Sequence, residues 1–545
     1  MSAGAGQLAV AGLGIGAVAA LSGLGVIATY RVTGVLNVAF GAIGMIGAFL
    51  LRAAVRDWGM PTGVAAAVIV AGCAPLFGLL LDAAVFRPLQ QRAAGVAAEL
   101  TAGFGVTVLL VGLATAGWGS GARTDAPSLL PAGSVQVGGL TVSTGVLVEL
   151  GVLAVVAAGL VALARNRTVG VAVRAVVDDR ALAELGGLPA RRLGRLGWAL
   201  GCALAAGAGM LLAPQLRLDP VTFTLVLFET LGVVVAARLV NPAIAVIVAL
   251  AAGIGQAELI GVQLTGRGGE VLAAVRSNLF VVVLLVAVWI APVFREARER
   301  VVAIPKQGTR AAQVGAYWPV VALAAATALL RPADVRTAQL IPALAIVLLS
   351  FRALGSAGLI SLGQTAFAGA GALVAAWTPT LGLLAAPAAG AALGLIFALP
   401  VARKRPLHLA LTTLALATAA SRFVFDQPLF APHATHRPSF IAGDKAFLLA
   451  GAVALGLVVL LLTPLDRGPS GRRLAAIRDS EPAARVLGID VERLRVLLFT
   501  LSAATAALGG ALWVYADGTF DSSAFDPLRG LIWLAAATAV GVLST

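Results

Sequence analysis

Few residues in this chain have the types and spacing that chemistry requires. His433 and His436 stand three positions apart, but no third ligand nearby would complete a metal site, so we expect none. Glu149 and Glu229 fall in apolar stretches, where ionisable groups are costly and are functional candidates. We interpret Glu149 as structural. For Glu229, a role in a translocation path and a hydrogen bond inside the bundle remain equally open.

A second group of candidates lies in two similar nine-residue stretches, residues 36–44 and 363–371. Each stretch carries one amide side chain and one phenylalanine at equivalent positions. Such amides either line a pore or bond to a neighbouring helix, and polar residues commonly do the latter in membranes. The candidates for a translocation path, besides Glu229, are Asn37, Phe40, Gln364 and Phe367.

The clearest pattern is a short charged helix that occurs twice. In the second copy, Ser480 suits the N-cap, Pro482 suits the first turn, and Gly488 suits the left-handed position after the last turn. In the first copy Asp179 takes the cap and Gly187 the stop. Connections in helical bundles usually have about 2–8 residues, whereas the two segments holding these helices are about thirty long. We therefore expect each helix to dock a cytoplasmic partner.

The sequence lacks the chemistry of nucleotide hydrolysis. A phosphate-binding loop of the type G-x-x-x-x-G-K-[ST] needs a lysine that follows a glycine, and Lys306, Lys404 and Lys445 follow other residues. We therefore expect no ATPase activity and no cofactor in this chain. Any ATP must be bound by partner proteins.

Membrane helices are the elements that position these residues. The chain of 545 residues is 60% hydrophobic and 12% charged, whereas soluble domains are about 45–50% apolar and about 25% charged. So few charges cannot cover a water-facing surface, which excludes a soluble enzyme, a disordered chain and a nucleic-acid binder despite the net charge of +14. The expected fold class is all-α, a polytopic helical protein embedded in membrane lipid.

Apolar stretches of about 17–25 residues are the candidates for membrane spans. We count about 17 of them, and some are interrupted by glycine or proline and suit half-helices. They are 7–29, 33–51, 61–85, 96–119, 144–164, 197–213, 221–237, 241–261, 278–294, 314–330, 338–351, 357–377, 380–400, 406–421, 445–464, 494–514 and 529–543.

The arginines predict the orientation. Counting spans places every strongly basic segment on one side, which the positive-inside rule assigns to the cytoplasm. The N-terminus is then outside, as are the loops 120–143 and 422–444. The basic segments are 165–195, 295–310, 403–405 and 467–495.

The sequence also predicts two homologous units. Displaced by 301 positions, residues 170–211 fall on 471–512 without a gap, and 14 of the 42 pairs are identical. Both copies have the same predicted orientation, so we expect two bundles in parallel pseudo-symmetry, an arrangement found in transporters. The expected division is 1–294 with about nine spans, a cytoplasmic linker at 295–314, and 315–545 with about eight spans.

The repeated segments resemble a known family. The stretches 170-GVAVRAVVDDRALAELGGLPARRL-193 and 471-GRRLAAIRDSEPAARVLGIDVERL-494 resemble the cytoplasmic loop in the membrane subunits of bacterial ABC importers. The stretches 33-TGVLNVAFGAIGMIGAFL-50 and 358-GLISLGQTAFAGAGALVAAW-377 resemble the early spans of the two permeases of high-affinity branched-chain amino-acid transporters. The first half is similar to one permease of that pair and the second half to the other, fused in one chain.

This resemblance implies a permease in the bacterial cytoplasmic membrane that imports branched-chain or similar amino acids. It also implies two cytoplasmic ATPases that drive transport and an extracytoplasmic binding protein that delivers the amino acid. The loop helices would dock on the ATPases. The residues carried over for this coupling are Asp178, Asp179, Arg180, Gly187, Arg478, Asp479, Glu481 and Gly488.

The two halves depart from each other at two places. Arg180 stands where the second copy has Glu481. The first half also continues past Asn241 for two more spans, whereas the second ends at about the corresponding point, so we expect the second unit to be C-terminally short.

The alternative to an ABC permease is an ion-coupled secondary transporter of small polar solutes. Such a transporter would need intramembrane charges at matched positions, and Gly530 stands opposite Glu229 at the repeat offset. A membrane enzyme would carry acidic or histidine clusters at a membrane edge, and the sequence has none. We therefore expect a transport permease and not an enzyme.

Overall fold

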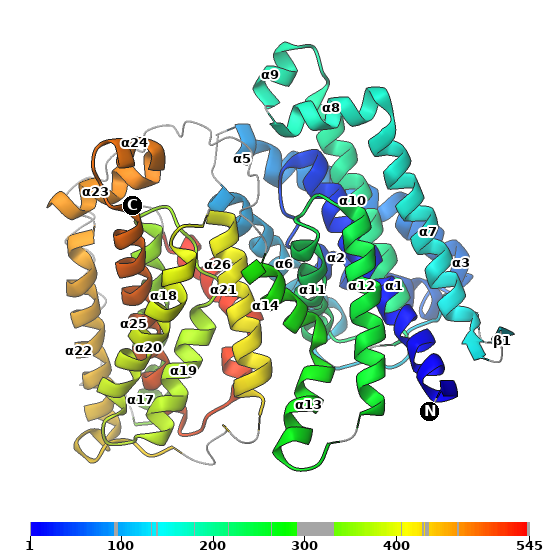
Figure 1. Cartoon of the computed structure of the whole chain (residues 1–545). Helices are drawn as coiled ribbons and strands as arrows, with labels where there is room; N and C mark the ends of the chain where they lie inside the picture. The colour runs from blue at the N-terminus through cyan, green and yellow to red at the C-terminus, as the bar shows by residue number, and fades with distance from the viewer. Residues whose placement is uncertain are drawn as a thin grey trace. The chain divides into compact units, whose positions relative to one another are not determined.

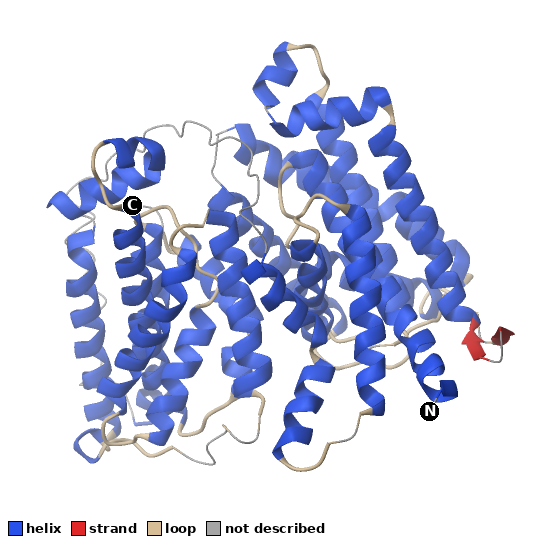
Figure 2. Ribbon diagram, viewed as in Figure 1, coloured by secondary structure: helices blue, strands red, loops and turns tan. Residues whose placement is uncertain are grey.

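The computed structural model describes residues 2–91, 96–131, 133–137, 140–178, 180–215, 217–262, 264–290, 332–404, 406–427, 430, 435–465 and 468–541. These residues are almost entirely helical, as the composition predicts (Figure 2). The chain forms two compact units, residues 1–300 and 301–545. The predicted linker at 295–314 and the predicted span at 314–330 lie outside the described residues.

Unit 1 consists of helices and one short β-hairpin (Figure 1). The run from α3 to α5 is one continuous helix in which two π-helical turns, η1 and η2, are inserted. The elements are α1 (Ser2–Thr33), α2 (Phe40–Arg56), α3 (Thr62–Val68), η1 (Ile69–Cys73), α4 (Ala74–Leu81), η2 (Asp82–Phe86), α5 (Arg87–Gln91), α6 (Val96–Trp118), β1 (Ser134–Val137), β2 (Leu140–Ser143), α7 (Thr144–Arg165), α8 (Arg167–Asp178), α9 (Arg180–Leu185), α10 (Ala190–Leu212), α11 (Pro220–Ala236), α12 (Pro242–Glu258), η3 (Leu259–Gly261), α13 (Arg267–Ser277) and α14 (Leu279–Ile290).

Unit 2 repeats much of this order of elements. They are α17 (Pro332–Ala338), α18 (Leu340–Gly355), α19 (Gln364–Trp377), α20 (Gly382–Val401), α21 (Pro406–Ala420), η5 (Ser421–Phe425), η6 (Ser439–Ile441), α22 (Asp444–Leu462), η7 (Thr463–Leu465), α23 (Gly468–Asp479), α24 (Glu481–Val486), α25 (Val491–Asp517), η8 (Ser522–Phe525) and α26 (Pro527–Ala539). By position in the repeat, α18 to α26 correspond to α1 to α11, with α20 in the place of α3 to α5.

The number of full-length spans is smaller than the sequence predicts. Among the described residues, 11 helices are long and apolar enough to cross a membrane, and the pair α13–α14, bent by 80°, is a twelfth candidate. Four predicted spans, 33–51, 221–237, 357–377 and 529–543, instead contain the short helices α2, α11, α19 and α26 of 17, 17, 14 and 13 residues.

Each short helix follows a non-helical segment within an apolar stretch, which explains the difference. Gly34 and Gly358 have φ of 73° and 71° where α1 and α18 end, a conformation that only glycine adopts without strain. The chain then resumes as α2 and α19. Helices α11 and α26 each begin with a proline, whose missing N–H costs nothing at the first helical position. Hydropathy alone cannot detect such breaks because the residues around them are apolar.

One helix lies at the centre of each unit: α10 packs against α1, α2 and α4, and α25 packs against α18, α19 and α20. Small residues permit this close packing. A Cβ atom on Gly209 would overlap the carbonyl group of Gly44 in α2, and one on Gly510 would overlap the carbonyl group of Ala368 in α19. The same helix pair is therefore in backbone contact in both units.

Candidate functional site

Each unit carries one long charged connection between two helices of its bundle. We define the first capped loop as residues 167–189, with α8 and α9, and the second capped loop as residues 468–490, with α23 and α24. In unit 1, the N-terminus and the β1–β2 hairpin lie at the end opposite to α8 and α9 (Figure 1). The predicted orientation likewise separates the first capped loop from the N-terminus and the loop 120–143.

The caps predicted for the second capped loop are confirmed. The Ser480 hydroxyl accepts a hydrogen bond from the backbone N–H of Ala483 at 3.4 Å, and Pro482 lies in the first turn of α24. Gly488 follows the helix with φ of 77°, the left-handed conformation expected after the last turn.

The first capped loop ends with the same hydrogen-bonding pattern. Gly187 has φ of 80°, and the N–H of Leu188 donates to the carbonyl of Ala183 at 3.0 Å. In the second capped loop, the N–H of Ile489 donates to the carbonyl of Ala484 at 3.1 Å. A bond across five residues with a left-handed glycine is the Schellman motif. Both glycines are therefore needed for the same turn.

A buried ion pair ties the second capped loop to its bundle. Arg495, whose side chain is 5% exposed, donates from Nη2 to Glu481 Oε2 at 2.5 Å and from Nη1 to Glu481 Oε1 at 3.2 Å. The same Nη1 also donates to the backbone carbonyl of Ala402 at 3.2 Å. Charge-assisted, two-point contacts of this kind are the strongest side-chain hydrogen bonds in proteins. One guanidinium thus joins α24, α25 and the end of α20.

More exposed charges extend this network. Arg485 donates to Glu481 at 2.9 Å, one helical turn along α24. Arg403 donates to Glu492 at 2.8 Å, but its side chain is 78% exposed. Surface pairs contribute about 0–1 kcal/mol to stability. The network therefore depends mainly on the buried pair of Glu481 and Arg495.

Equivalent apolar side chains support both capped loops. Ala484 is fully buried against a cluster that includes Ile477 and Val491. In unit 1, a cluster of Val176, Ala183 and Ala190 lies under the first capped loop. These three residues stand at the repeat positions of Ile477, Ala484 and Val491.

In the two capped loops and the first turns of the helices that follow them, the charges are opposite at three matched positions, and at another an arginine is matched by a glycine. Glu481, Arg485 and Glu492 of the second copy are replaced by residues of the other sign, and Arg495 is replaced by a residue without a side chain. The replacements in the first copy are Arg180, Glu184, Arg191 and Gly194. Gly194 cannot form the buried ion pair.

Apolar side chains project from the end of each short helix. Val486 is 89% exposed and the matched Leu185 is 85% exposed. A charged residue precedes each, Arg485 in the second loop and Glu184 in the first. An exposed apolar side chain among charges is typical of a surface that another protein covers.

The remaining predicted coupling residues occupy the ends of these helices. Asp178 ends α8 and Arg180 begins α9, while Asp179 lies outside the described residues. Arg478 lies in the last turn of α23, just before α24, and its side chain packs against the left-handed Gly358. Asp479 lies 3.9 Å from the Nε atom of Arg478, at the limit of an ion pair.

The predicted path residues of unit 2 are parts of the packed core. Gln364 makes the cross-helix bond we expected, donating from Nε2 to the Ser502 hydroxyl at 2.7 Å. Ser502 in turn donates to the carbonyl of Ser350 at 2.7 Å. Phe367 packs edge-to-face on Phe499, with ring centroids 5.6 Å apart.

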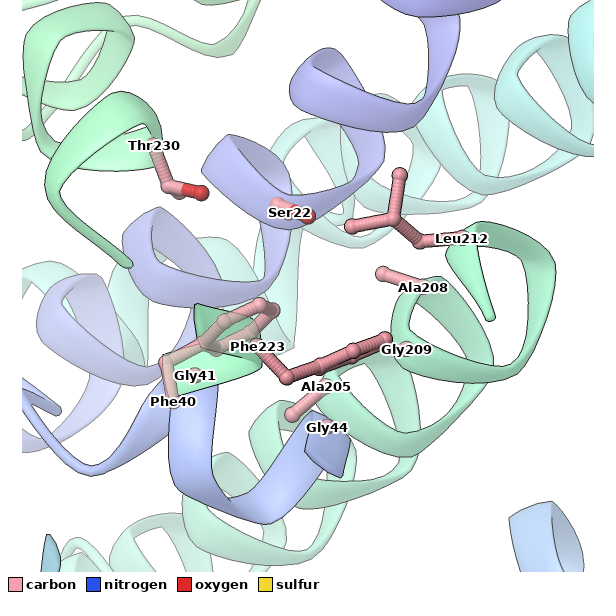
Figure 3. A pocket seen from close by; sticks show the side chains of 10 residues that line it. All are labelled: Ser22, Phe40, Gly41, Gly44, Ala205, Ala208, Gly209, Leu212, Phe223 and Thr230. Atoms are coloured by element: carbon pink, nitrogen blue, oxygen red, sulfur yellow. The ribbon is translucent and has the colours of Figure 1, made fainter. Parts of the chain in front are cut away.

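The path residues of unit 1 have a different environment. Asn37 is 1% exposed, and neither atom of its amide has a hydrogen-bond partner among the described residues. Phe40 begins α2 and lines a cavity of about 20 Å³ between α1, α2, α10 and α11 (Figure 3). Ser22 and Thr230 contribute hydroxyl groups to the wall of this cavity. Such a volume holds about one water molecule.

Glu149 has the structural environment we expected. It is 1% exposed and accepts a hydrogen bond from Gln215 Nε2 at 2.8 Å. Glu229 lies in α11. Among the described residues, no three histidine, cysteine or acidic side chains gather as a metal site would require, and His433 is outside them.

An ion pair also fixes the long loop of unit 1. Arg52 of α2 donates to Asp125 at 2.6 Å and pairs with Asp57 at 3.3 Å. The hydrogen bond from Arg52 lowers the pKa of Asp125 below its ordinary value of 3.8. The loop after α6 is thereby held to the end of α2.

Our reading of the sequence missed Arg495 as a partner of Glu481. The two residues stand 14 positions apart on different helices, so no helical spacing rule connects them. A signal was available in the repeat, because Glu481 and Arg495 both differ from their counterparts in the first copy. Paired differences between two copies indicate a contact present in only one of them.

The chain matches a protein family over two separate regions. The family is described as branched-chain amino acid transport system / permease component, and it matches residues 8–289 and 335–544. No solved structure matches the chain.

Three curated relatives are named as high-affinity branched-chain amino acid transport system permease proteins. LivM of Escherichia coli (strain K12) is 41% identical over 83 residues, 13% of this chain and 20% of that protein, and LivM of Salmonella typhimurium gives the same values. BraD of Pseudomonas aeruginosa is 27% identical over 223 residues, 38% of this chain and 71% of that protein. The chain thus spans one fifth of the length of the two LivM relatives.

Proposed function

The chain belongs to the branched-chain amino acid transport system / permease component family, and from this membership we propose that it is the membrane part of an ABC importer for branched-chain amino acids. The family match covers two regions, so one chain carries two permease units. It is a multi-pass membrane protein and a component of a transport system. The parallel arrangement of the units and an external N-terminus remain part of the proposal.

The repeated capped loop is the observation that carries the coupling step. A short helix that carries an exposed apolar residue and is followed by a left-handed glycine occurs at the same place in both units, and in the second unit Ser480 also caps its N-terminus. A rigid, partly apolar helix between two membrane helices suits a groove on a second protein. We assign that groove to an ABC ATPase, one for each loop, because the chain has no phosphate-binding loop of its own.

The substrate class follows from the names of the relatives. The LivM and BraD proteins are permeases for branched-chain amino acids. We propose the same class for this chain, together with an extracytoplasmic binding protein that presents the amino acid.

Reconstitution tests this function directly. The chain is co-expressed with candidate ABC ATPases, purified as a complex and placed in liposomes with a candidate binding protein. We expect leucine to stimulate ATP hydrolysis and to accumulate inside. A matched complex, in which the ATPases lack their phosphate-binding lysine, should do neither.

The same liposomes separate this proposal from ion-coupled transport. Leucine uptake that follows a proton gradient in the absence of any ATPase would replace the ABC assignment with the secondary transporter. Substitution of Glu229 by Gln would then abolish uptake, because an ion-coupled mechanism needs a titratable group inside the membrane.

A further inference from the structure

Three phenylalanine rings meet between helices α19, α21 and α26 of unit 2. Phe425 ends the π-helical turn η5 after α21, Phe520 lies in the loop after α25, and Phe525 ends η8 just before α26. The ring centroid of Phe425 lies 5.9 Å from that of Phe520 and 6.3 Å from that of Phe525. The rings of Phe520 and Phe525 are stacked, with centroids 5.7 Å apart. We call these three residues the ring cluster.

The ring cluster lies inside the bundle and not at its end. In the last turn of α25, the Tyr515 hydroxyl donates to the carbonyl of Ala375 in α19 at 3.1 Å. A Cβ atom on Gly369 of the same helix would lie 3.1 Å from the Cβ atom of Phe525 and would overlap the ring of Phe425. Gly369 and Ala375 are six residues apart, a helical rise of about 9 Å. The chain between α25 and α26 therefore runs about 9 Å back along α19.

Polar groups in this returning loop are exposed. Asp521 and Ser523 both lie on the surface of the unit, and the Ser523 hydroxyl donates to Asp521 Oδ2 at 2.6 Å. At membrane depth, irregular backbone and ionised side chains are tolerated where they border water inside the protein, because lipid cannot solvate them. The loop side of the ring cluster therefore borders water.

Polar groups on the other side of the ring cluster are buried. Gln364 and Thr365 form the start of α19, about one turn before Gly369. Their side chains are 1% and 0% exposed, and among the described residues neither Gln364 Oε1 nor Thr365 Oγ1 has a hydrogen-bond partner. Buried polar atoms usually have partners, so these two indicate a polar molecule that visits them. The N-terminus of α19 also favours a negatively charged group, such as the carboxylate of an amino acid.

We propose that the ring cluster is the outer gate of unit 2, closing the way from the loop at Asp521 to the start of α19. This rests on the proposed function, which supplies the amino acid and the direction of its passage. Ring contacts are apolar and not directional, so the rings can part without breaking hydrogen bonds. Phe425 and Phe525 are 2% and 1% exposed, whereas Phe520 is half-buried on a loop. Phe520 is thus the ring that turns aside at the lowest cost.

Thiol labelling in right-side-out membrane vesicles tests the closed gate. Cys73→Ser and Cys202→Ala remove the native thiols, and Thr365→Cys places a thiol of similar size behind the ring cluster. A charged, membrane-impermeant methanethiosulfonate reagent outside should label Thr365→Cys slowly. Adding Phe520→Ala should accelerate this labelling about tenfold or more, because access follows the open population. Ser523→Cys, in front of the ring cluster, should react fast in both backgrounds.

Two control variants separate a gate from general loosening of the bundle. Phe520→Tyr keeps the ring, and Phe447→Ala removes a ring that is 1% exposed in α22, away from the ring cluster. Each should change the labelling of Thr365→Cys by less than about twofold. A second opening variant, Phe425→Leu, should act like Phe520→Ala. Unchanged labelling in both opening variants, or equal acceleration by Phe447→Ala, would overturn the gate.

Turnover shows whether the gate serves transport. With the ATPases, ATP inside and the binding protein with leucine outside, labelling of Thr365→Cys should accelerate about threefold or more, because the gate opens in each cycle. Leucine uptake in the same vesicles with unchanged labelling would place the route elsewhere and overturn the proposal. A complex without any ATP-dependent uptake would instead disprove the proposed function, and labelling of the resting protein would still decide whether the ring cluster closes the way.

Discussion

The two capped loops are two versions of the same charged connection between helices of a bundle. Both end in a left-handed glycine with the same hydrogen bond across five residues, and both rest on three apolar side chains at matched positions. In the loops and the first turns of the helices that follow, however, the charges are reversed at three positions, and a buried arginine after one loop is matched by a glycine after the other. The backbone of the loop is thus the shared requirement, whereas its charges are specific to each unit.

The largest expected effect concerns the packing that both units share. Gly209→Ala and Gly510→Ala should each destabilise the protein by about 3 kcal/mol, because the new methyl group would overlap a backbone carbonyl of the neighbouring helix. Thermal unfolding in detergent measures this loss.

Gly207 provides the control for this pair of variants. A Cβ atom there would have its nearest neighbour, Val70, at 3.9 Å, and the matched position in unit 2 is Leu508. Gly207→Ala should be neutral or slightly stabilising, since alanine favours a helix by about 0.5–1 kcal/mol. If only one of the variants Gly209→Ala and Gly510→Ala lost thermal stability, α10 and α25 would not be packed alike.

Next in size is the docking of the exposed apolar residues. Leu185→Asp and Val486→Asp should each weaken binding of the ATPase to the membrane chain about tenfold or more, because a charge replaces an apolar contact at the centre of an interface. Both side chains are exposed, so the thermal stability of the chain alone should not change. Binding is measured with purified ATPase and the chain in nanodiscs, and equal binding by wild type and variants would remove these residues from the interface.

The shared turn predicts an equal, smaller loss in both loops. Gly187→Ala and Gly488→Ala should each cost about 1 kcal/mol, since a Cβ atom is disfavoured at φ of 80° and 77°. Local hydrogen exchange measures the loss in each loop. The neighbouring Gly186→Ala is the control, because its φ is not positive. A loss in one loop alone would mean that only that turn keeps its geometry in lipid.

A graft sharpens the contrast between the loops. Arg180→Glu combined with Gly194→Arg transfers the buried pair to unit 1, where a Cβ on Gly194 would meet only Asp82 Oδ1 at 3.9 Å. We expect exchange in the first capped loop to slow about threefold, because a two-point contact between the new arginine and the new glutamate would tie α9 to α10. Gly194→Arg alone is the control, and equal protection by the single variant would show that Asp82 is its real partner.

The smallest effect is the pH dependence of the loop held by Arg52. The pKa of Asp125 is lowered in the folded chain, so its contribution to stability is complete above the ordinary value of 3.8 and is lost as the pH falls through the lowered value. Exchange in residues 120–131 should therefore be constant from pH 5 to pH 8, after correction for the intrinsic rate. Asp125→Asn should accelerate it at every pH in this range.

The helices were predictable where apolar stretches are continuous, and their ends were not. Residues around Gly34 and Gly358 are as apolar as the helices they interrupt, so hydropathy extends the spans 33–51 and 357–377 across the breaks. Glycine with a free φ was the local signal, but glycine is also abundant inside these helices. Only the packing decides which glycine bends the chain.

The candidate site was predictable in its local parts only. Ser480, Pro482 and Gly488 act within one short helix, and their roles follow from sequence position. The contact of Glu481 with Arg495 depends on how α24 folds back on α25, which no local rule describes. Phe367 is a path candidate from its place in the repeat, and its edge-to-face contact with Phe499 on α25 has no local signal in the sequence.

Carrying both loops on one polypeptide fixes their ratio at one of each per molecule. Separate subunits would allow mixed populations whenever one gene product is altered or made in excess. Here a substitution in the first loop is always accompanied by an intact second loop, so genetic complementation, single-site labelling and suppressor selection report on one defined side of the assembly.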